Sequence, residues 1–236
     1  NEKLVKVNQE KNEFLSIAAH DLKNPLSAIQ GLAEMIARDF DEMSKSEILE
    51  LANMISLSSQ QMFELIKNLL DVNRLESGNL NISLGVFDIL PVLEWVVKDY
   101  QDRAKVKNIT LHFDRAEAEY HALGDEKILR QVLDNLISNA VKYSPRGKQV
   151  YVRVSKNKQA VRCEIQDEGP GLSEEDKQQL FGKFTRLTPQ PTGDENSTGL
   201  GLFIVKKLVE AMRGKVWCET ELGKGARFIV EFRTEL

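Results

Sequence analysis

The stretch Phe14-Leu-Ser-Ile-Ala-Ala-His-Asp-Leu-Lys-Asn-Pro-Leu26 decides the fold of the N-terminal part of the chain. Read as part of a long helix over residues 1 to about 39, it belongs to a run of apolar residues at heptad spacing: Leu15, Ala18, Leu22, Pro25, Ile29, Leu32 and Ile36. A seam with this spacing faces a partner helix and is buried against it. His20 falls on the opposite side of the same helix, so we expect its imidazole to point to solvent.

His20 has three chemically distinctive neighbours on this helix. Asp21 follows directly, and its carboxylate can reach a ring nitrogen. Asn24 lies four residues on and shares the exposed face of His20. Pro25 lacks an N–H and crowds the carbonyl of Asp21, so we expect the helix to bend there. A lone exposed histidine on a coiled coil carries no chemistry by itself, and this crowding is what favours a reactive role.

A second heptad pattern follows a short polar turn and stops near Ser77-Gly78. Its seam consists of Ile48, Leu51, Ile55, Ser58, Met62, Leu65, Leu69 and Val72. Ser44 or Ser46 is expected to cap this helix, with Glu47 adding negative charge in its first turn. Further apolar residues widen both stripes: Phe14, Ile17, Leu26, Phe63, Ile66 and Leu70. Two helices cannot bury such stripes alone, so we predict a homodimer through residues 1–77 that forms a four-helix bundle.

Composition narrows the possible partners of the chain. With 236 residues, 42% hydrophobic and 29% charged, it has the profile of a globular protein of one or two domains. The net charge is −4 and no run of five Lys or Arg occurs, which argues against nucleic acid as a partner. No apolar stretch is long enough to span a membrane, and the start is not a signal peptide. Because the chain begins with Asn1, we expect a cytoplasmic piece of a longer protein, with room for a membrane anchor upstream.

Neither the cysteines nor the histidines indicate a metal cage. Cys163 and Cys218 lie in alternating apolar stretches and are interpreted as small core residues of strands, in a reducing compartment. The three histidines do not cluster.

Alternating strands and helices replace the heptads after residues 78–85, which are interpreted as a linker with a glycine at each end. We expect helices over 87–107, 125–144 (with Asp125 as N-cap), 173–184 and 200–213. Strands are expected over 109–113, 150–154 and 161–165, and a hairpin over 215–220 and 226–232. Residues 86–236 should therefore form an α/β sandwich, a mixed sheet covered by helices on one face.

The expected helix that contains Gln131-Val-Leu-Asp-Asn-Leu-Ile-Ser-Asn-Ala-Val-Lys-Tyr143 has one polar side. That side carries Asn135, Asn139, Lys142 and Tyr143. Two amides lower helix propensity, which favours a function over plain polar surface. An amide oxygen is a suitable ligand for Mg²⁺, and a lysine is suited to a phosphate.

Two glycine-containing segments could complete a nucleotide site. Asp167-Glu-Gly-Pro-Gly171 follows a strand, and a carboxylate there can accept a hydrogen bond from an exocyclic amine such as that of adenine, although a plain turn fits as well. Ser197-Thr-Gly-Leu-Gly-Leu202 opens a helix, whose free N–H groups and dipole attract an anion. This second segment is neither a Walker loop nor a Rossmann fingerprint. The polar residues 187–196 between them predict a mobile lid over a triphosphate.

In this order the clusters resemble the sensor histidine kinases of two-component signalling, over nearly the whole chain. Residues 14–25 are similar to the family's H box, 135–143 to the N box, 167–171 to the G1 box and 199–201 to the G2 box. The stretch Leu180-Phe-Gly-Lys-Phe-Thr-Arg186 is similar to the F box, whose aromatics seat the base of the lid, Phe184 among them.

The resemblance implies an α+β protein of two domains. Residues 1–77 would be the dimerisation and histidine phosphotransfer domain, and residues 86–236 the catalytic ATP-binding domain of Bergerat (GHKL) type. It also implies these nucleotide contacts: Asp167 to the adenine amine, Asn139 to Mg²⁺ with Asn135 in support, Lys142 and Tyr143 to phosphate and ribose, and Arg186 near the γ-phosphate. The remaining motif positions expected at the nucleotide are Gly169, Gly171, Gly199, Leu200 and Gly201.

The implied reaction is autophosphorylation of His20 from ATP, followed by transfer to an aspartate in the receiver domain of a response regulator. A neutral imidazole is a usable nucleophile near pH 7. Asp21 can hold the other ring nitrogen, fix the tautomer and stabilise the charge that develops. Asn24 is placed to orient a water against a phosphorylated regulator, which predicts phosphatase activity as well.

Two other functions share parts of this pattern. An ATPase of the gyrase or chaperone class would share the nucleotide clusters, but it would carry a general-base glutamate in the Asn135 helix, where this chain has Asp134. It would also leave the His20 helices unexplained. A dimeric scaffold with degenerate nucleotide pockets is disfavoured by the presence of Asn139, Asp167 and both glycine pairs.

Overall fold

The computed structural model describes residues 2–78, 80–116, 119–185, 187–193 and 198–234, and among the side chains of residues 2–14 only those of Val5, Gln9 and Asn12. The chain divides into two compact units, Asn1–Asn73 and Arg74–Leu236. Among the described residues, none of the helices combines the length and the apolarity that crossing a bilayer requires.

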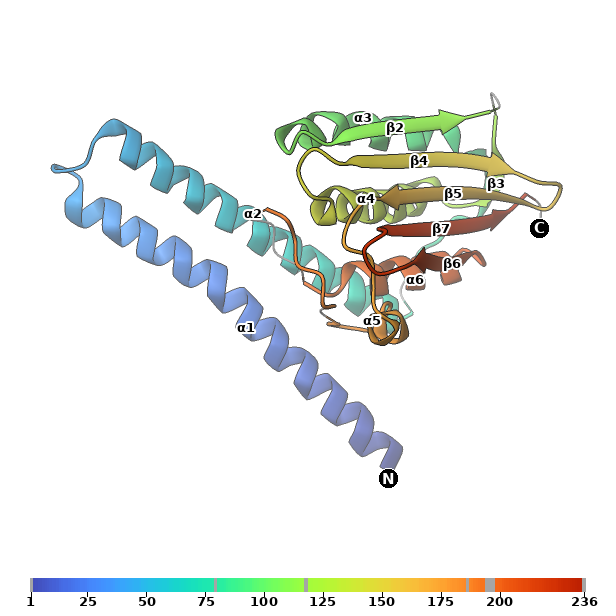
Figure 1. The fold of residues 1–236 in the computed structure, drawn as a ribbon. Helices are drawn as coiled ribbons and strands as arrows, with labels where there is room; N and C mark the ends of the chain where they lie inside the picture. Colours follow the sequence, from blue (N-terminus) through green and yellow to red (C-terminus); the bar gives the residue numbers. More distant parts are fainter. Residues whose placement is uncertain (1, 79, 117–118, 186, 194–197, 235–236) are drawn as a thin grey trace. The chain divides into compact units, whose positions relative to one another are not determined.

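The first unit is a helical hairpin of α1 (Glu2–Asp39) and α2 (Lys45–Glu76), and the last turn of α2 belongs to the second unit (Figure 1). The helix α1 continues through Pro25. Ser44 caps α2: its Oγ accepts the N–H of Glu47 at 3.3 Å, and Glu47 Oε2 accepts the N–H of Ser44 at 2.8 Å. This reciprocal capping box selects Ser44 over Ser46 as the N-cap.

Burial confirms most of the predicted seam. Ala18, Leu65 and Val72 are buried, and the other predicted seam residues are partly buried, except that Leu15 is 52% exposed. The predicted burial of Leu15 is therefore wrong for the single chain. Four of the flanking apolar residues are also exposed: Leu26, Phe63, Ile66 and Leu70. Ile17 is partly buried, and the side chain of Phe14 lies outside the described part.

The second unit is a mixed five-stranded sheet with helices against one face (Figure 1). Its helices are α3 (Leu90–Val106), α4 (Glu126–Tyr143), α5 (Glu174–Gln179) and α6 (Gly201–Ala211). Its strands are β1 (Gly85–Asp88), β2 (Thr110–Arg115), β3 (His121–Gly124), β4 (Gln149–Lys156), β5 (Ala160–Asp167), β6 (Lys215–Thr220) and β7 (Ala226–Arg233). The sheet order is β2-β4-β5-β7-β6, parallel only between β2 and β4, and β1 pairs with β3 separately. The α/β sandwich predicted from the sequence is confirmed.

Local departures from the predicted elements have identifiable causes. The first helix of this unit begins at Leu90 and not at Phe87, because residues 85–88 pair with β3 and the carboxylate of Asp88 accepts the N–H groups of Leu90 (3.1 Å) and Tyr120 (2.8 Å). The helix predicted over 173–184 ends at Gln179, whose carbonyl accepts the N–H of Gly182 in a turn.

The segment interpreted as a linker is tied to the second unit at both ends. Glu76, in the last turn of α2, forms an ion pair with Lys183 at 2.5 Å. The N–H of Ser83 donates to Oδ2 of Asp125 at 2.9 Å, while Oδ1 of the same residue caps α4 by accepting from Lys127 and Ile128. Gly85, predicted to absorb rotation, pairs with Gly124 in the β1–β3 ladder. The predicted domain boundaries at 77 and 86 remain predictions.

Candidate active site

His20 stands on the solvent side of α1, as its position opposite the seam predicts. Its side chain is 70% exposed, and Nδ1 lies 3.2 Å from Oδ1 of Asp21, whose side chain is only 10% exposed. Asn24 is exposed one turn further along the helix. The imidazole is therefore exposed on α1, with the largely buried carboxylate of Asp21 against Nδ1 and the amide of Asn24 on the same helix.

The burial of one face of α4 in the core fixes which of its residues lie on the exposed, polar face. Eight of its residues are buried: Ile128, Leu129, Val132, Leu133, Leu136, Ile137, Ala140 and Val141. Asn135, Asn139, Lys142 and Tyr143 are all partly exposed. Nδ2 of Asn135 donates to the carbonyl of Gln131 at 2.9 Å, and a Cβ on Gly201 would lie 3.1 Å from its Oδ1. The N-terminus of α6 thus lies against Asn135, which joins two of the predicted clusters.

Asp134, the neighbour of Asn135, has a different role from a water-activating base. Its Oδ1 accepts the hydroxyl of Tyr100 from α3 at 3.0 Å. Burial, with the charge of Asp134 next in importance, raises the pKa of Tyr100 above its ordinary value. The pair therefore stays hydrogen-bonded at neutral pH and holds α3 to α4.

The C-terminal end of α4 is held by two residues that the sequence did not mark. Nζ of the buried Lys107 donates to the carbonyls of Val141 (2.9 Å) and Lys142 (3.0 Å), where a cation is favoured by the helix dipole. The hydroxyl of Thr192, in the predicted lid, contacts the carbonyls of Lys142 (3.1 Å) and Ser144 (2.6 Å). No periodicity or motif distinguishes either residue in the sequence.

Asp167 ends β5 with its carboxylate almost fully buried, at 5% exposure. Its Oδ1 accepts the N–H groups of Gly169 (2.8 Å) and Ala226 (3.1 Å). Burial is the main cause that raises the pKa of Asp167 to about 6, and these two bonds oppose it. A Cβ on Gly169 would lie 2.8 Å from Asp167 Oδ1 and 3.0 Å from the carbonyl of Tyr143, so the end of α4 meets the Asp167 loop here.

At two of the predicted motif glycines, neighbouring backbone atoms leave no room for a side chain. Gly171 has φ +69° and a Cβ there would lie 2.1 Å from the carbonyl of Glu221; Gly199 has φ +68° and a Cβ would lie 2.8 Å from the carbonyl carbon of Phe184. Both the positive φ and the lack of space exclude a side chain. Leu200, between Gly199 and Gly201, is fully buried, so its side chain belongs to the core.

The predicted lid is anchored at its start by Asp176, which the prediction missed. One carboxylate oxygen of Asp176 accepts the N–H (2.9 Å) and the hydroxyl (3.1 Å) of Thr188, and the other accepts the N–H (3.3 Å) and the hydroxyl (3.0 Å) of Ser173. The spacing Ser173-x-x-Asp176 is a capping box and could have identified this residue. Arg186 and residues 194–197 lie outside the described residues.

Within the described residues no three or more His, Cys, Asp or Glu side chains are grouped as a metal cage. The amide oxygen of the partly exposed Asn139 is chemically suited to a hard cation such as Mg²⁺.

Family models match both units of the chain. Residues 10–78 match the His Kinase A (phospho-acceptor) domain, and residues 124–236 match the histidine kinase-, DNA gyrase B-, and HSP90-like ATPase. The chain belongs to the sensor histidine kinases. The first model contains His20, and the second contains every described residue of the nucleotide clusters.

Relatives of this kinase are longer proteins. Sensor protein EvgS of Escherichia coli (strain K12) is 30% identical over 241 residues, which are 99% of this chain and 20% of EvgS. Sensor protein SrrB of Staphylococcus aureus is 29% identical over 225 residues, 95% of this chain and 38% of SrrB. The chain thus spans about a fifth to two fifths of these relatives.

Solved histidine kinases share the fold. Acinetobacter baumannii AdeS is 25% identical, with a TM-score of 0.70 over 92% of this chain and 98% of that one. Full-length ShkA in complex with AMPPNP is 26% identical, with a TM-score of 0.68 over 94% of this chain and 45% of ShkA. ThkA in complex with the response regulator TrrA is 22% identical, with a TM-score of 0.72 over 99% and 67%.

Proposed function

We propose that this kinase transfers the γ-phosphoryl group of Mg-ATP to Nε2 of His20 and then to an aspartate of a response regulator. The observation that carries the proposal is the exposed imidazole whose Nδ1 is held by Asp21 at 3.2 Å. A proton on Nδ1, donated to the carboxylate, leaves the lone pair on Nε2 free to attack. The new N–P bond forms as the bond from the γ-phosphorus to the bridging oxygen breaks and ADP leaves.

The nucleotide is proposed to bind between α4, the Asp167 loop and α6. Asp167 would accept the adenine amine, Tyr143 would contact ribose, and Lys142 would contact phosphate. The backbone at Gly199, Leu200 and Gly201 would face the phosphates at the N-terminus of α6. Asn139, supported by Asn135, would hold Mg²⁺, which supplies positive charge to the transferring group when bound. Arg186 stays a prediction for the γ-phosphate. ShkA, with AMPPNP bound, supports a nucleotide at this fold.

Labelling with γ-phosphate-labelled ATP and Mg²⁺ tests the function. We expect the protein to acquire label that is lost in acid and stable in base, the behaviour of a phosphoramidate and the opposite of a phosphoserine. ATP hydrolysis without any protein-bound label would instead support an ATPase.

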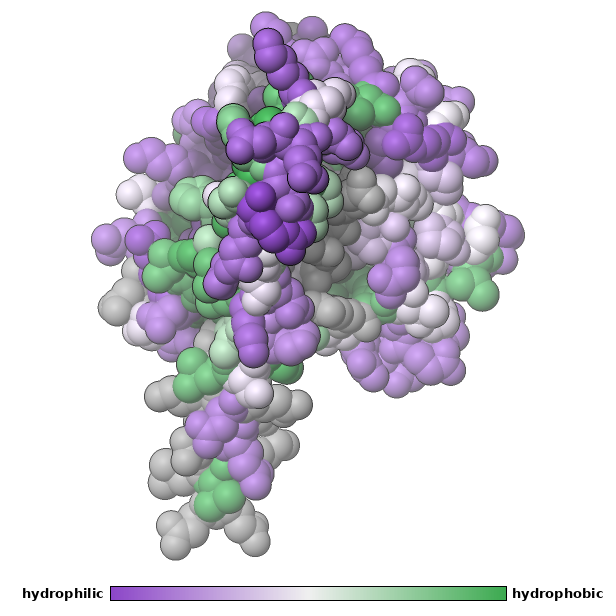
Figure 2. Space-filling model, turned by 90° about the vertical axis from the view of Figure 1, so that its left-hand side faces the viewer, coloured by the Kyte–Doolittle hydropathy of each residue, from purple (hydrophilic) through white to green (hydrophobic). Residues whose placement is uncertain are grey.

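The hairpin is proposed to be the homodimer interface. Its exposed apolar residues include Leu49 (63%), Phe63 (70%) and Leu70 (56%), and Figure 2, seen from the side of the hairpin loop, shows hydrophobic patches between hydrophilic residues. A second copy would cover them in a four-helix bundle. Light scattering at micromolar concentration should give twice the 26.8 kDa of one chain. A single-chain mass at that concentration would contradict the dimer.

Phosphatase activity toward the regulator is proposed to depend on Asn24. ThkA, which has the same fold, was solved with its response regulator, and Asn24 is exposed beside His20, where a docked receiver domain would lie. Replacing Asn24 with alanine should slow dephosphorylation of the phosphorylated regulator about tenfold or more, with autophosphorylation within about twofold of wild type. Undiminished dephosphorylation by the variant would remove Asn24 from this role.

A further inference from the structure

The turn between β6 and β7 is fitted onto the loop that follows Asp167. The N–H of Gly223 donates to the carbonyl of Pro170 at 2.7 Å. A Cβ on Gly171 would lie 2.1 Å from the carbonyl of Glu221, and a Cβ on Gly225 would lie 2.0 Å from the carbonyl of Asp167. The backbones of the two segments are therefore in direct contact, with no side chain between them.

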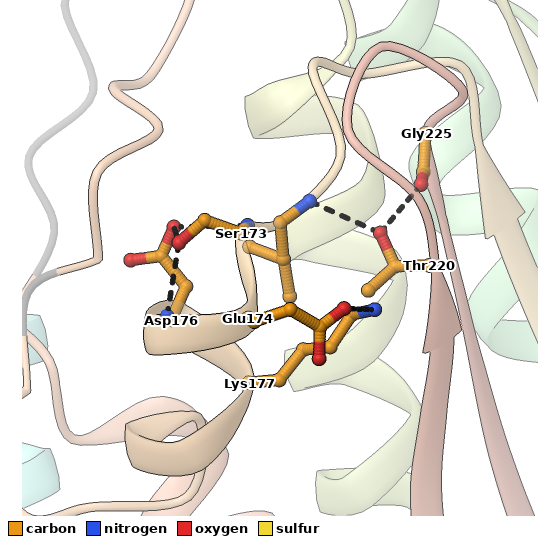
Figure 3. A network of polar contacts seen from close by, with 7 residues as sticks. Ser173, Glu174, Asp176, Lys177, Thr220 and Gly225 are labelled. Atoms are coloured by element: carbon orange, nitrogen blue, oxygen red, sulfur yellow. Dashed lines mark hydrogen bonds and ion pairs between the residues drawn. The ribbon is translucent and has the colours of Figure 1, made fainter.

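Thr220, the last residue of β6, links these two segments through its hydroxyl. Oγ1 accepts the N–H of Leu172, in the Asp167 loop, at 3.1 Å, and donates to the carbonyl of Gly225, in the turn, at 2.7 Å (Figure 3). Both functions of the hydroxyl are thus used within the protein. Valine has nearly the same shape and can replace neither bond.

The carbonyl that Thr220 binds belongs to the same peptide group that binds Asp167. In the peptide bond between Gly225 and Ala226, the carbonyl accepts from Thr220, and the N–H donates to Oδ1 of Asp167 at 3.1 Å. Hydrogen bonds at both ends of one peptide group polarise each other and fix its plane. Thr220 therefore sets the direction of one of the two N–H groups that orient the buried carboxylate.

The same loop leads from Thr220 toward the predicted lid. Leu172 precedes Ser173, whose side chain and backbone bond to Asp176 (Figure 3). Asp176 in turn accepts from Thr188. Thr220 is thus linked by hydrogen bonds to the peptide group that binds Asp167 and to the loop that leads to Asp176.

We propose that Thr220 is a positioning residue that sets the base specificity of the nucleotide site by orienting Asp167. The inference rests on the proposed function, in which Asp167 accepts the adenine amine. Guanine presents a carbonyl oxygen where adenine presents that amine, so an oriented carboxylate attracts one base and repels the other. When the Ala226 N–H is no longer held in direction through Thr220, the carboxylate turns more freely and discriminates less.

Competition of ATP and of GTP against a fluorescent ATP analogue, each with Mg²⁺, tests the proposal on the full chain. In T220V we expect affinity for ATP to fall about tenfold and affinity for GTP to change less than about twofold, so the preference for ATP shrinks. The KM for ATP in autophosphorylation should rise while the rate at saturating ATP stays within about twofold. T220S, which keeps the hydroxyl, should restore the preference. T110V, an exposed position on the opposite edge strand, is the matched control.

An unchanged ATP-to-GTP ratio in T220V, or an equal loss of both nucleotides, would overturn the positioning role while leaving the proposed function intact. Failure of T220S to restore the ratio would overturn it too. Wild-type protein that binds neither nucleotide would contradict the proposed function itself, and with it the inference. If circular dichroism shows that T220V does not fold, T220A is measured in its place. The ratio of its affinities for ATP and GTP is expected to fall as that of T220V would.

Discussion

Replacement of His20 by alanine should abolish phosphoryl transfer from ATP to the protein, a loss of at least about a thousandfold. The variant removes the proposed nucleophile, and the other two histidines, His112 and His121, lie in the second unit. Because the side chain of His20 is 70% exposed, its loss leaves no cavity and should not disturb folding. The measurement is acid-labile label after incubation with labelled ATP, with nucleotide affinity determined in parallel.

H121A is the matched control, since His121 is also an exposed histidine, 55% accessible, on β3. It should label like wild type. H20A should bind ATP as wild type does, which separates a lost acceptor from a lost nucleotide site. Acid-labile label persisting on H20A would show that another side chain is the acceptor.

Replacement of Asp167 by asparagine should weaken ATP binding by about a hundredfold, because an amide N–H then faces the adenine amine in place of an accepting oxygen. The amide oxygen can still accept from Gly169 and Ala226, so the loop should keep its shape. Calorimetric titration with ATP and Mg²⁺ measures the loss. E164Q, on the same strand but paired with Arg227 across the sheet, is the control and should bind ATP normally.

The same variant should become more stable than wild type as the pH rises, because wild type loses stability and the variant does not. Burial raises the pKa of Asp167 from 3.8 to about 6, so the folded state binds the proton more tightly than the unfolded state. The stability associated with the protonated carboxyl is present below pH 3.8 and is lost as the pH rises through about 6. Asparagine has no such loss, and D167N should exceed wild type by roughly 3 kcal/mol above this range.

Urea unfolding of both proteins at about pH 4.5, near the lower end of this range, and at about pH 7.5, above it, measures the difference. The stability gap should widen toward the higher pH, where the variant is expected to have lost nucleotide binding. Parallel pH dependence of the two proteins would contradict an Asp167 that is harder to ionise in the folded state. The buried carboxylate proposed to bind adenine would then not lower the stability of the wild-type protein.

The parts of the fold that the sequence predicted are those specified by neighbouring residues. The heptads define α1 and α2 because burial on one face repeats every turn or two, and Asp125 caps α4 through N–H groups only two and three residues away. Strands β1 and β3 were missed because each has only four residues and pairs with a segment more than thirty residues distant. Alternation cannot be recognised over such short segments.

In the candidate site, too, the residues that could be predicted are those that belong to local sequence patterns. Asn135, Asn139 and Asp167 belong to local patterns, a polar face of a helix and a strand end, and could be predicted from them. Lys107 and Thr220 act on backbone groups 34 and 48 residues away, through contacts that exist only after folding. Their roles in the chemistry, like those of the predicted motif residues, stay predictions until the variants are measured.

Asp125 connects two segments that are far apart in the sequence, the residues before β1 and the first turn of α4. One carboxylate oxygen binds the first turn of α4 and the other binds Ser83, in the segment that arrives from the hairpin. A displacement of Ser83 that kept this bond would therefore act on the first turn of α4 through a single carboxylate.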